Sequence, residues 1–183
     1  MPERMPGEIA QAAGFRAFAS PRLEDAGIAL RDATDGDAPF IAAVYASTRA
    51  EELEPVPWTP DQKKIFTDWQ SHQQEAHYAM HYPHAERLVV EREGPVGRLY
   101  IDTTRVEVRL MEVTLLPPFR NQGIGSRLMD EVLAYADALA LPASLHVEPF
   151  NPARRMYDRL GFVVKETRGI YEFMVRALPA APS

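Results

Sequence analysis

Two glycines and the polar residues around them form the stretch of this sequence that points most directly to chemistry. The run from Arg120 to Ser126 reads RNQGIGS, and it separates an apolar, β-favouring run from a segment with apolar residues at helical spacing. A strand, a glycine-containing turn and a helix in this order expose backbone N–H groups at the helix N-terminus, where phosphate and other anions bind. Gly123 and Gly125 allow close approach to the backbone because they carry no side chain, and Arg120 adds a positive charge.

The glycine spacing differs from those of two common phosphate-binding loops. It lacks the Gly-x-Gly-x-x-Gly pattern of a dinucleotide-binding loop and the Gly-Lys-Ser/Thr ending of a nucleoside-triphosphate loop. A strand-to-helix turn that happens to contain two glycines explains these residues equally well. The elements on either side therefore have to decide between the two interpretations.

Hydrophobic periodicity and turn residues predict a mixed α/β domain. Strands are expected at 27–31, 87–92, 96–102, 107–116, 142–148, 162–167 and 170–178. Helices are expected at 38–51, from 59 or 60 to 77 or 78, at 126–140 and at 153–160. We expect the folded domain to cover 26–178, with a loosely attached N-terminal extension at 1–25 and a C-terminal tail at 179–183.

Composition limits the classes of protein to which the chain can belong. Its 183 residues suffice for one domain with its own core. The absence of cysteine excludes a disulfide framework, a thiolate metal site and a cysteine nucleophile, and it fits a cytoplasmic location. A formal net charge of -6 disfavours a broad nucleic-acid interface. No apolar run is long enough to span a membrane, so we expect neither nucleic acid nor membrane as a partner.

Two segments, taken together, resemble a known family. The residues that carry the resemblance are Leu115, Pro117, Arg120, Gly123 and Gly125 in the first segment, and Asn151, Tyr157, Gly161 and Phe162 in the second. In this order, with a helix and a strand between them, they resemble the Gcn5-related N-acetyltransferases (GNAT). The resemblance runs from about Ile28 to Leu178 and implies an α/β (α+β) fold. Its mixed, mostly antiparallel sheet of about six to seven strands would be flanked by helices and splayed at the acetyl-CoA site.

The resemblance also implies a donor and the residues that bind it. Acetyl-CoA would be the acetyl donor, with its pyrophosphate on the backbone N–H groups of the glycine-containing loop. The residues that this assigns to the pyrophosphate are Asn121, Gln122, Gly123, Ile124, Gly125 and Ser126, with Arg120 beside them. Val113, Thr114 and Leu115 would pair with the pantetheine arm and hold the thioester carbonyl. Asn151 matches a residue of the cofactor-facing turn, although it stands one residue closer to Tyr157 than in many relatives.

Acyl transfer to an amine needs a base, a donor to the carbonyl oxygen and a proton for the departing thiolate. The resemblance gives the last role to Tyr157, which could instead be a packed aromatic residue beside Met156 and Leu160. His146 and Glu112 are the candidate bases. His146, with an ordinary pKa of about 6.5, matches the place of a glutamate in several ribosomal-protein acetyltransferases, yet a half-buried strand histidine fits as well. Glu112 could instead form an ion pair or lie on a solvated face of the sheet. Either candidate base could also act through water.

The acceptor is expected near the end of the first predicted helix. There Glu51, Glu52 and Trp58 would suit a cationic amine, although an ordinary solvated loop explains them as well. Histidines at 72, 77, 81 and 84 suggest a metal, but Pro83 interrupts the helix face that they would share, so no metal is expected. A homodimer is compatible with the sequence, which carries no signal for an oligomeric state.

Two functions follow from these residues. The first is an acetyl-CoA-dependent N-acetyltransferase, in which a deprotonated primary amine attacks the thioester directly. Its acceptor would be a small molecule, an amino-acid derivative or a protein N-terminus. The second is a non-catalytic acyl-CoA-binding or sensing domain of the same fold. The intact loop and Tyr157 favour the enzyme.

Overall fold

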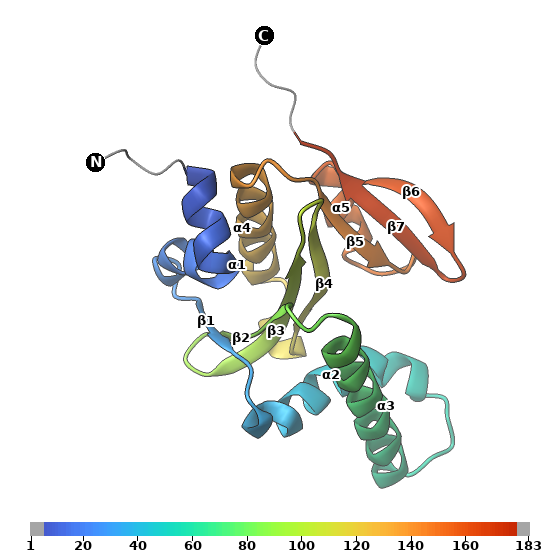
Figure 1. Ribbon diagram of the computed structural model, residues 1–183. Coiled ribbons are helices and arrows are strands. Elements are labelled where there is room, and N and C mark those ends of the chain that lie inside the picture. The colour runs from blue at the N-terminus through green and yellow to red at the C-terminus, as the bar shows by residue number, and fades with distance from the viewer. Residues whose placement is uncertain (1–5, 179–183) are drawn as a thin grey trace.

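A seven-stranded sheet in the order β1-β2-β3-β4-β5-β7-β6 runs through the computed structural model (Figure 1). The structure describes the backbone of residues 6–178 and the side chains of residues 14–178, so the tail predicted at 179–183 lies outside the described residues. The strands are β1 (Ala29–Asp32), β2 (Glu86–Glu91), β3 (Pro95–Thr103), β4 (Val108–Leu115), β5 (Ala143–Val147), β6 (Val163–Arg168) and β7 (Tyr171–Arg176). Only the pair β4–β5 is parallel, which confirms the predicted mixed, mostly antiparallel sheet.

Helices cover both faces of this sheet (Figure 1). They are α1 (Pro6–Glu24), α2 (Ala38–Leu53), α3 (Pro60–His81), α4 (Ile124–Ala138) and α5 (Arg154–Arg159), with short 3-10 turns η1 (Asp35–Asp37) and η2 (Pro117–Phe119). Apolar residues of α1 and α4 share one core with Leu99 and Ile101 of β3. The alternate β3 residues, Arg98 and Tyr100, face α3 on the other side of the sheet. Within residues 6–178, no helix has the length and apolar character needed to cross a membrane.

The N-terminal helix α1 is part of the folded core. Phe15, Ala19 and Leu23 are buried, and the Phe15 ring lies edge-on to Tyr135 of α4 at 5.5 Å. The Glu86 carboxylate accepts hydrogen bonds from the backbone N–H groups of Phe15 (2.6 Å) and Arg16 (2.9 Å). The expectation of a loosely attached extension is therefore wrong for these residues. Its helical pattern was weak because Gly14, at a φ of 73°, divides the helix and interrupts the periodicity.

Helix α3 turns its large apolar residues toward solvent. Ile65 and Trp69 are 70% and 59% exposed, whereas the polar residues Thr67 and Ser71 are buried. The large apolar residues Ile65 and Trp69 therefore do not mark the side of α3 that faces the sheet. The face of the sheet below α3 presents polar side chains such as Arg98, so the helix turns polar partners toward it.

Strand β4 changes its alternation at a bulge and then separates from β5. Tyr100 of β3 pairs with Glu112 and Ile101 pairs with Leu110, so Met111 is the extra residue. A bulge shifts the side-chain alternation by one residue. The last recorded β4–β5 pair is Leu110↔Leu145, and residues 111–115 have no partner on β5. The strands thus separate as the family resemblance implies, which confirms the predicted splay.

Candidate active site

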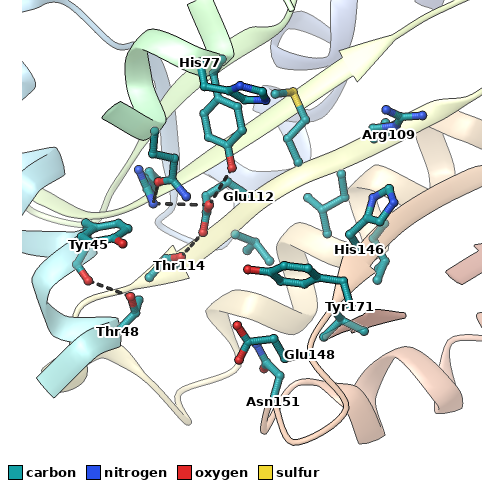
Figure 2. Close-up of a pocket in the computed structure, with 18 of the residues that line it drawn as sticks. Tyr45, Thr48, His77, Arg109, Glu112, Thr114, His146, Glu148, Asn151 and Tyr171 are labelled. Carbon is teal, nitrogen blue, oxygen red and sulfur yellow. Dashed lines mark hydrogen bonds and ion pairs between the residues drawn. The ribbon is translucent and has the colours of Figure 1, made fainter. Parts of the chain in front are cut away.

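A cavity of about 580 Å³ lies beside the β4–β5 gap (Figure 2). Side chains from α2, α3, β4, β5, α5 and the start of β7 line it. The elements on its two sides are far apart in the sequence, and the order β4-β5-β7 in the sheet brings them together. All three catalytic residues predicted from sequence, Glu112, His146 and Tyr157, line this cavity.

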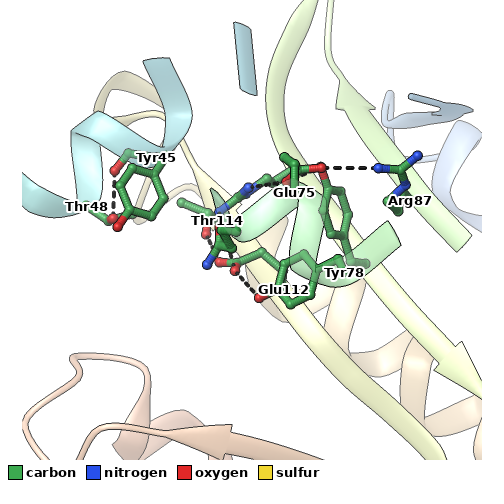
Figure 3. Close-up of polar contacts among 10 residues, drawn as sticks. Tyr45, Thr48, Glu75, Tyr78, Arg87, Glu112 and Thr114 are labelled. Carbon is green, nitrogen blue, oxygen red and sulfur yellow. Dashed lines mark hydrogen bonds and ion pairs between the residues drawn. The ribbon is translucent and has the colours of Figure 1, made fainter. Parts of the chain in front are cut away.

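Glu112 is held by three side chains on the α3 face of the sheet. Thr114 donates a hydrogen bond from Oγ1 to Oε1 of Glu112 at 2.7 Å, and Tyr78 donates from its hydroxyl to Oε2 at 3.3 Å. A guanidinium nitrogen of Arg98 also lies 3.3 Å from Oε2. Glu112 therefore forms the ion pair that the sequence left open as an alternative to a base. Figure 3 shows these contacts beside the carboxylate.

Arg98 connects Glu112 to α3. It is 1% exposed, and its guanidinium donates hydrogen bonds to Glu75 Oε1 at 3.0 Å and to Gln74 Oε1 at 2.8 Å. Glu75 also accepts from the Tyr100 hydroxyl at 3.1 Å and lies 3.4 Å from an Arg87 nitrogen (Figure 3). Sequence reasoning did not single out Arg98. The available signal was a charged residue inside the apolar strand from Val96 to Ile101.

Tyr157 combines packing with access to the cavity. It is 5% exposed, and its ring lies edge-on to Phe162 at 5.9 Å. Burial, aided by the negative charge of Glu112, raises the pKa of Tyr157 to about 12. The hydroxyl is therefore protonated at neutral pH and can donate a hydrogen bond. Among the described residues, its hydroxyl has no hydrogen-bond partner.

His146 stands on the outer face of β5, where its ring packs against Phe173 with 4.9 Å between centroids. Partial desolvation, together with the positive charges of Arg109 and Arg168, lowers the pKa of His146. The imidazole is consequently neutral at neutral pH, which is the form that can accept a proton. Both the packing and the base interpretation of His146 are compatible with this position.

The glycine-containing loop presents unpaired backbone donors. No hydrogen bond from the backbone N–H groups of residues 121–126 is found within the part of the chain that the structure describes. Gly123 adopts the left-handed conformation at a φ of 80° immediately before α4. A Cβ atom added at Gly123 or Gly125 would meet nothing within 4 Å, so the space over the loop is open. These amides at a helix N-terminus fit the pyrophosphate of a coenzyme A derivative.

The side chains of the same loop brace it instead of projecting outward. Arg120 donates from Nε to the Leu115 carbonyl oxygen at 2.8 Å and from a terminal nitrogen to Ser47 Oγ at 3.0 Å. Gln122 donates from Nε2 to the Pro118 carbonyl oxygen at 2.6 Å. Arg120 thus ties the end of β4 to α2, and this use of its guanidinium differs from the free charge that the sequence suggested.

Asn151 lies where the β5–α5 turn borders the cavity (Figure 2). Its Oδ1 accepts a hydrogen bond from the Ala153 backbone N–H at 2.9 Å, which holds the turn immediately before the short helix α5. The Arg154 N–H donates to the Asn151 carbonyl oxygen at 2.9 Å. This tight turn accommodates the shortened spacing to Tyr157 while Tyr157 still reaches the cavity.

The predicted acceptor residues are placed unequally. Glu52 lines the cavity but forms an ion pair with Arg49 at 2.9 Å. Glu51 and Trp58 lie outside the lining, and Trp58 packs instead on Phe66 with 5.2 Å between ring centroids. The structure therefore gives no support to an acceptor role for these two residues. Among the described residues, no three His, Cys, Asp or Glu side chains converge as a metal site.

Several cavity residues had no signal in the sequence. Tyr45 of α2, Tyr171 of β7 and Glu148 after β5 all line the cavity. Figure 2 shows the Tyr171 ring extending from its strand into the space between Glu112 and Glu148. The proximity of Tyr171 and Glu148 depends on the placement of β7 beside β5, which the local sequence pattern does not encode.

Comparisons with known proteins identify the family and the fold of the chain. A family model described as the acetyltransferase (GNAT) family matches residues 42–162, from α2 through α5. The chain matches no curated protein. Its fold is similar to that of the PaiA N-acetyltransferase from Thermoplasma acidophilum in complex with coenzyme A, with a TM-score of 0.61 and 14% identity over 82% of this chain and 98% of that one.

Two further solved structures show the same likeness. An acetyltransferase from Thermus thermophilus has a TM-score of 0.60 and 18% identity over 82% of this chain and 97% of that one. A protein from Corynebacterium glutamicum, described as a histone acetyltransferase and related acetyltransferase, has a TM-score of 0.58 and 22% identity over 86% of this chain and 99% of that one. At these identities the likeness establishes the shared fold.

Proposed function

Because the chain belongs to the acetyltransferase (GNAT) family, we propose that it transfers the acetyl group of acetyl-CoA to a primary amine. The acceptor is a small molecule, an amino-acid derivative or a protein N-terminus. One observation carries the proposal: the end of β4, which has no partner on β5, lines the cavity of Glu112, His146 and Tyr157 and is followed along the chain by the free amides of residues 121–126. Acetyl-CoA, when bound, supplies an activated acetyl group on a good leaving thiolate.

Donor binding in this proposal uses mainly backbone groups. The N–H groups of residues 121–126 hold the pyrophosphate, because they are free and stand at the positive end of the α4 dipole. The backbone of Val113, Thr114 and Leu115, which has no partner on β5, pairs with the pantetheine arm. Asn151 borders the opposite side of the gap and keeps the α5 turn in place.

Proton transfer in this proposal is divided among three side chains. His146 takes the proton of the acceptor ammonium, directly or through water, because its imidazole is neutral at neutral pH. Tyr157 donates its proton to the sulfur of the departing thiolate, because its raised pKa keeps the hydroxyl protonated. Tyr157 then regains a proton from the nitrogen, which loses its second proton as the amide forms. Glu112 acts as a fixed negative charge beside them, since Arg98, Tyr78 and Thr114 already bind its oxygens.

The experiment that tests the proposal separates binding from turnover. Acetyl-CoA affinity is measured by calorimetry, and CoA release is measured with polyamines, amino acids, aminoglycosides and N-terminal peptides. Binding together with amine-dependent CoA release supports the enzyme. Binding without release by any amine supports the alternative, a non-catalytic acyl-CoA-binding or sensing domain. Absence of binding contradicts both.

A further inference from the structure

The charges around the cavity are almost completely paired. Arg49 pairs with Glu52 at 2.9 Å, Arg109 pairs with Glu107, and Arg98 pairs with Glu75 at 3.0 Å and Glu112 at 3.3 Å. Arg87 is the second cation beside Glu75. Each of these four arginines is thus engaged by at least one carboxylate.

Glu148 is the exception. It lines the cavity and is half-buried, yet its side chain has no ion pair or hydrogen bond among the residues that the structure describes. The lining itself contains three arginines (Arg49, Arg98, Arg109) and three carboxylates (Glu52, Glu112, Glu148). Arg109 pairs with Glu107 outside the lining, whereas Arg49 pairs with Glu52 and Arg98 with Glu112, so Glu148 is the carboxylate left without an arginine. A cation can approach Glu148 without displacing an arginine from it.

An aromatic wall stands beside this carboxylate. The Tyr171 ring extends into the cavity next to Glu148 (Figure 2). Burial and the negative charge of Glu148 raise the pKa of Tyr171, while the positive charge of Arg49 opposes the rise. Tyr45 of α2 lines the same cavity from the other side. The Arg49 guanidinium lies over the Tyr45 ring, 5.5 Å from its centroid, so Tyr171 is the aromatic side chain that remains beside Glu148. A carboxylate next to an aromatic ring is a favourable environment for an ammonium group.

We propose that the acceptor carries a second, cationic nitrogen in addition to the amine that is acetylated, and that this cation binds between Glu148 and Tyr171. The inference rests on the proposed function and names its substrate class: diamines, polyamines and other amines with a distant ammonium group. Glu148 and Tyr171 thereby become specificity-determining residues.

A second cation also explains the charge pattern in chemical terms. The amine that attacks the thioester must be neutral. A carboxylate beside that amine would stabilise its protonated, unreactive form. An ammonium group elsewhere on the same molecule can remain charged and hold the substrate in place. Glu148 then contributes binding energy without opposing the deprotonation that His146 carries out.

The test uses substrates that differ only in the group far from the reacting amine. Linear diamines of several lengths are compared with alkylamines and ω-amino acids of the same lengths, by initial rates of CoA release. The diamine should have the highest kcat/KM at its best length, above the alkylamine on the order of tenfold, since a hydrogen bond to a charged group contributes about that factor. The ω-amino acid should be the poorest substrate because its carboxylate meets Glu148.

Two variants and a control locate the effect. Glu148→Gln should raise KM for the diamine on the order of tenfold and leave the alkylamine unchanged, since only the far ammonium group loses its partner. Tyr171→Leu, which removes the ring, should weaken the same preference. Glu24→Gln removes an exposed carboxylate from α1, which packs with α4 and not with the cavity, and should retain the wild-type preference.

Equal kcat/KM for the diamine and the alkylamine would overturn the inference, and so would a diamine preference that survives Glu148→Gln. Both results would still be compatible with the proposed acetylation of an amine. Calorimetric binding of the diamine to the CoA-loaded protein keeps the two proposals separate. Glu148-dependent binding without CoA release would support the cation site and contradict the enzyme.

Discussion

Arg98 and Glu112 form an ion pair at 3.3 Å between neighbouring strands, directly beside the gap in which the donor is expected. The arginine is 1% exposed, and the same guanidinium also binds Glu75 and Gln74 of α3. This single side chain therefore fixes both the position of α3 and the orientation of a cavity carboxylate. Positioning of the site and stability of the fold consequently depend on the same residue.

Removal of this guanidinium should cost more stability than removal of an exposed one. Arg98→Met leaves two carboxylates without their buried partner, and a broken buried pair costs about 3–5 kcal/mol. Arg87→Met removes a partly exposed cation from the same Glu75 and should cost about 0–1 kcal/mol. Urea unfolding of both variants measures the difference. Similar losses for the two variants would show that Arg98 contributes no more than a surface pair.

The close approach of β3 to β4 at Gly97 gives a second prediction. A Cβ atom at Gly97 would lie 2.3 Å from the Thr114 carbonyl oxygen and 3.1 Å from the Leu115 Cα, and backbone atoms cannot yield as a side chain can. Gly97→Ala should therefore displace the end of β4, lower stability by about 1–3 kcal/mol and weaken acetyl-CoA binding.

Gly36→Ala is the matched control for this substitution. Its Cβ would meet only Thr34 Oγ1, at an ordinary 3.6 Å. Thermal unfolding and acetyl-CoA calorimetry should show little change for Gly36→Ala. An unchanged affinity in a destabilised Gly97→Ala would separate the fold of β4 from its use as a donor-binding strand.

Much of the fold was predictable because the sequence has strong local signals. Gly161 after a short helix, the Glu93-Gly94 turn and the apolar runs of β2 and β3 place these elements within a few residues of their observed bounds. The place of α1 in the core is hard to predict, because Gly14 interrupts its helical pattern. In addition, the helix resumes after Gly14 with a Phe15 N–H group that donates to Glu86, a residue distant in the sequence.

The candidate site was less predictable, since its parts meet only through sheet order. His146, Glu112 and Tyr157 belong to recognisable segments, and they do line one cavity. Tyr171 and Glu148 come together because β7 pairs with β5, which no local pattern reports. Trp58 lies in the loop in which the acceptor was expected, but its ring packs on Phe66 and does not line the cavity.

The lowered pKa of His146 predicts the pH dependence of turnover. Partial desolvation, Arg109 and Arg168 favour the neutral imidazole, so the base form persists to lower pH than for an ordinary histidine at about 6.5. As pH falls through the lowered pKa, His146 becomes protonated and kcat/KM should fall. His146→Gln should remove this acidic limb of the pH profile of kcat/KM and reduce kcat on the order of a hundredfold.

Two variants distinguish this assignment from its alternatives. Arg168→Gln removes a positive charge that lowers the pKa of His146, so the limb should move slightly toward higher pH. Glu112→Gln should keep the limb if Glu112 is only a fixed charge. Loss of the limb in Glu112→Gln, with the limb retained in His146→Gln, would assign the base to Glu112 instead.

Tyr157 provides the sharpest separation between binding and chemistry. Its ring packs against Phe162, and Phe at position 157 preserves that packing while it removes only the hydroxyl. Because the pKa of Tyr157 is about 12, the hydroxyl remains protonated throughout the working range and adds no descending limb to the pH profile. Tyr157→Phe should leave acetyl-CoA affinity and the unfolding free energy nearly unchanged and lower kcat on the order of a hundredfold. The loss should be smaller with an acetyl donor whose thiol has a lower pKa, because a better leaving thiolate needs its proton less. If kcat is unchanged with both donors, Tyr157 is a packing residue and the departing thiolate takes its proton from water.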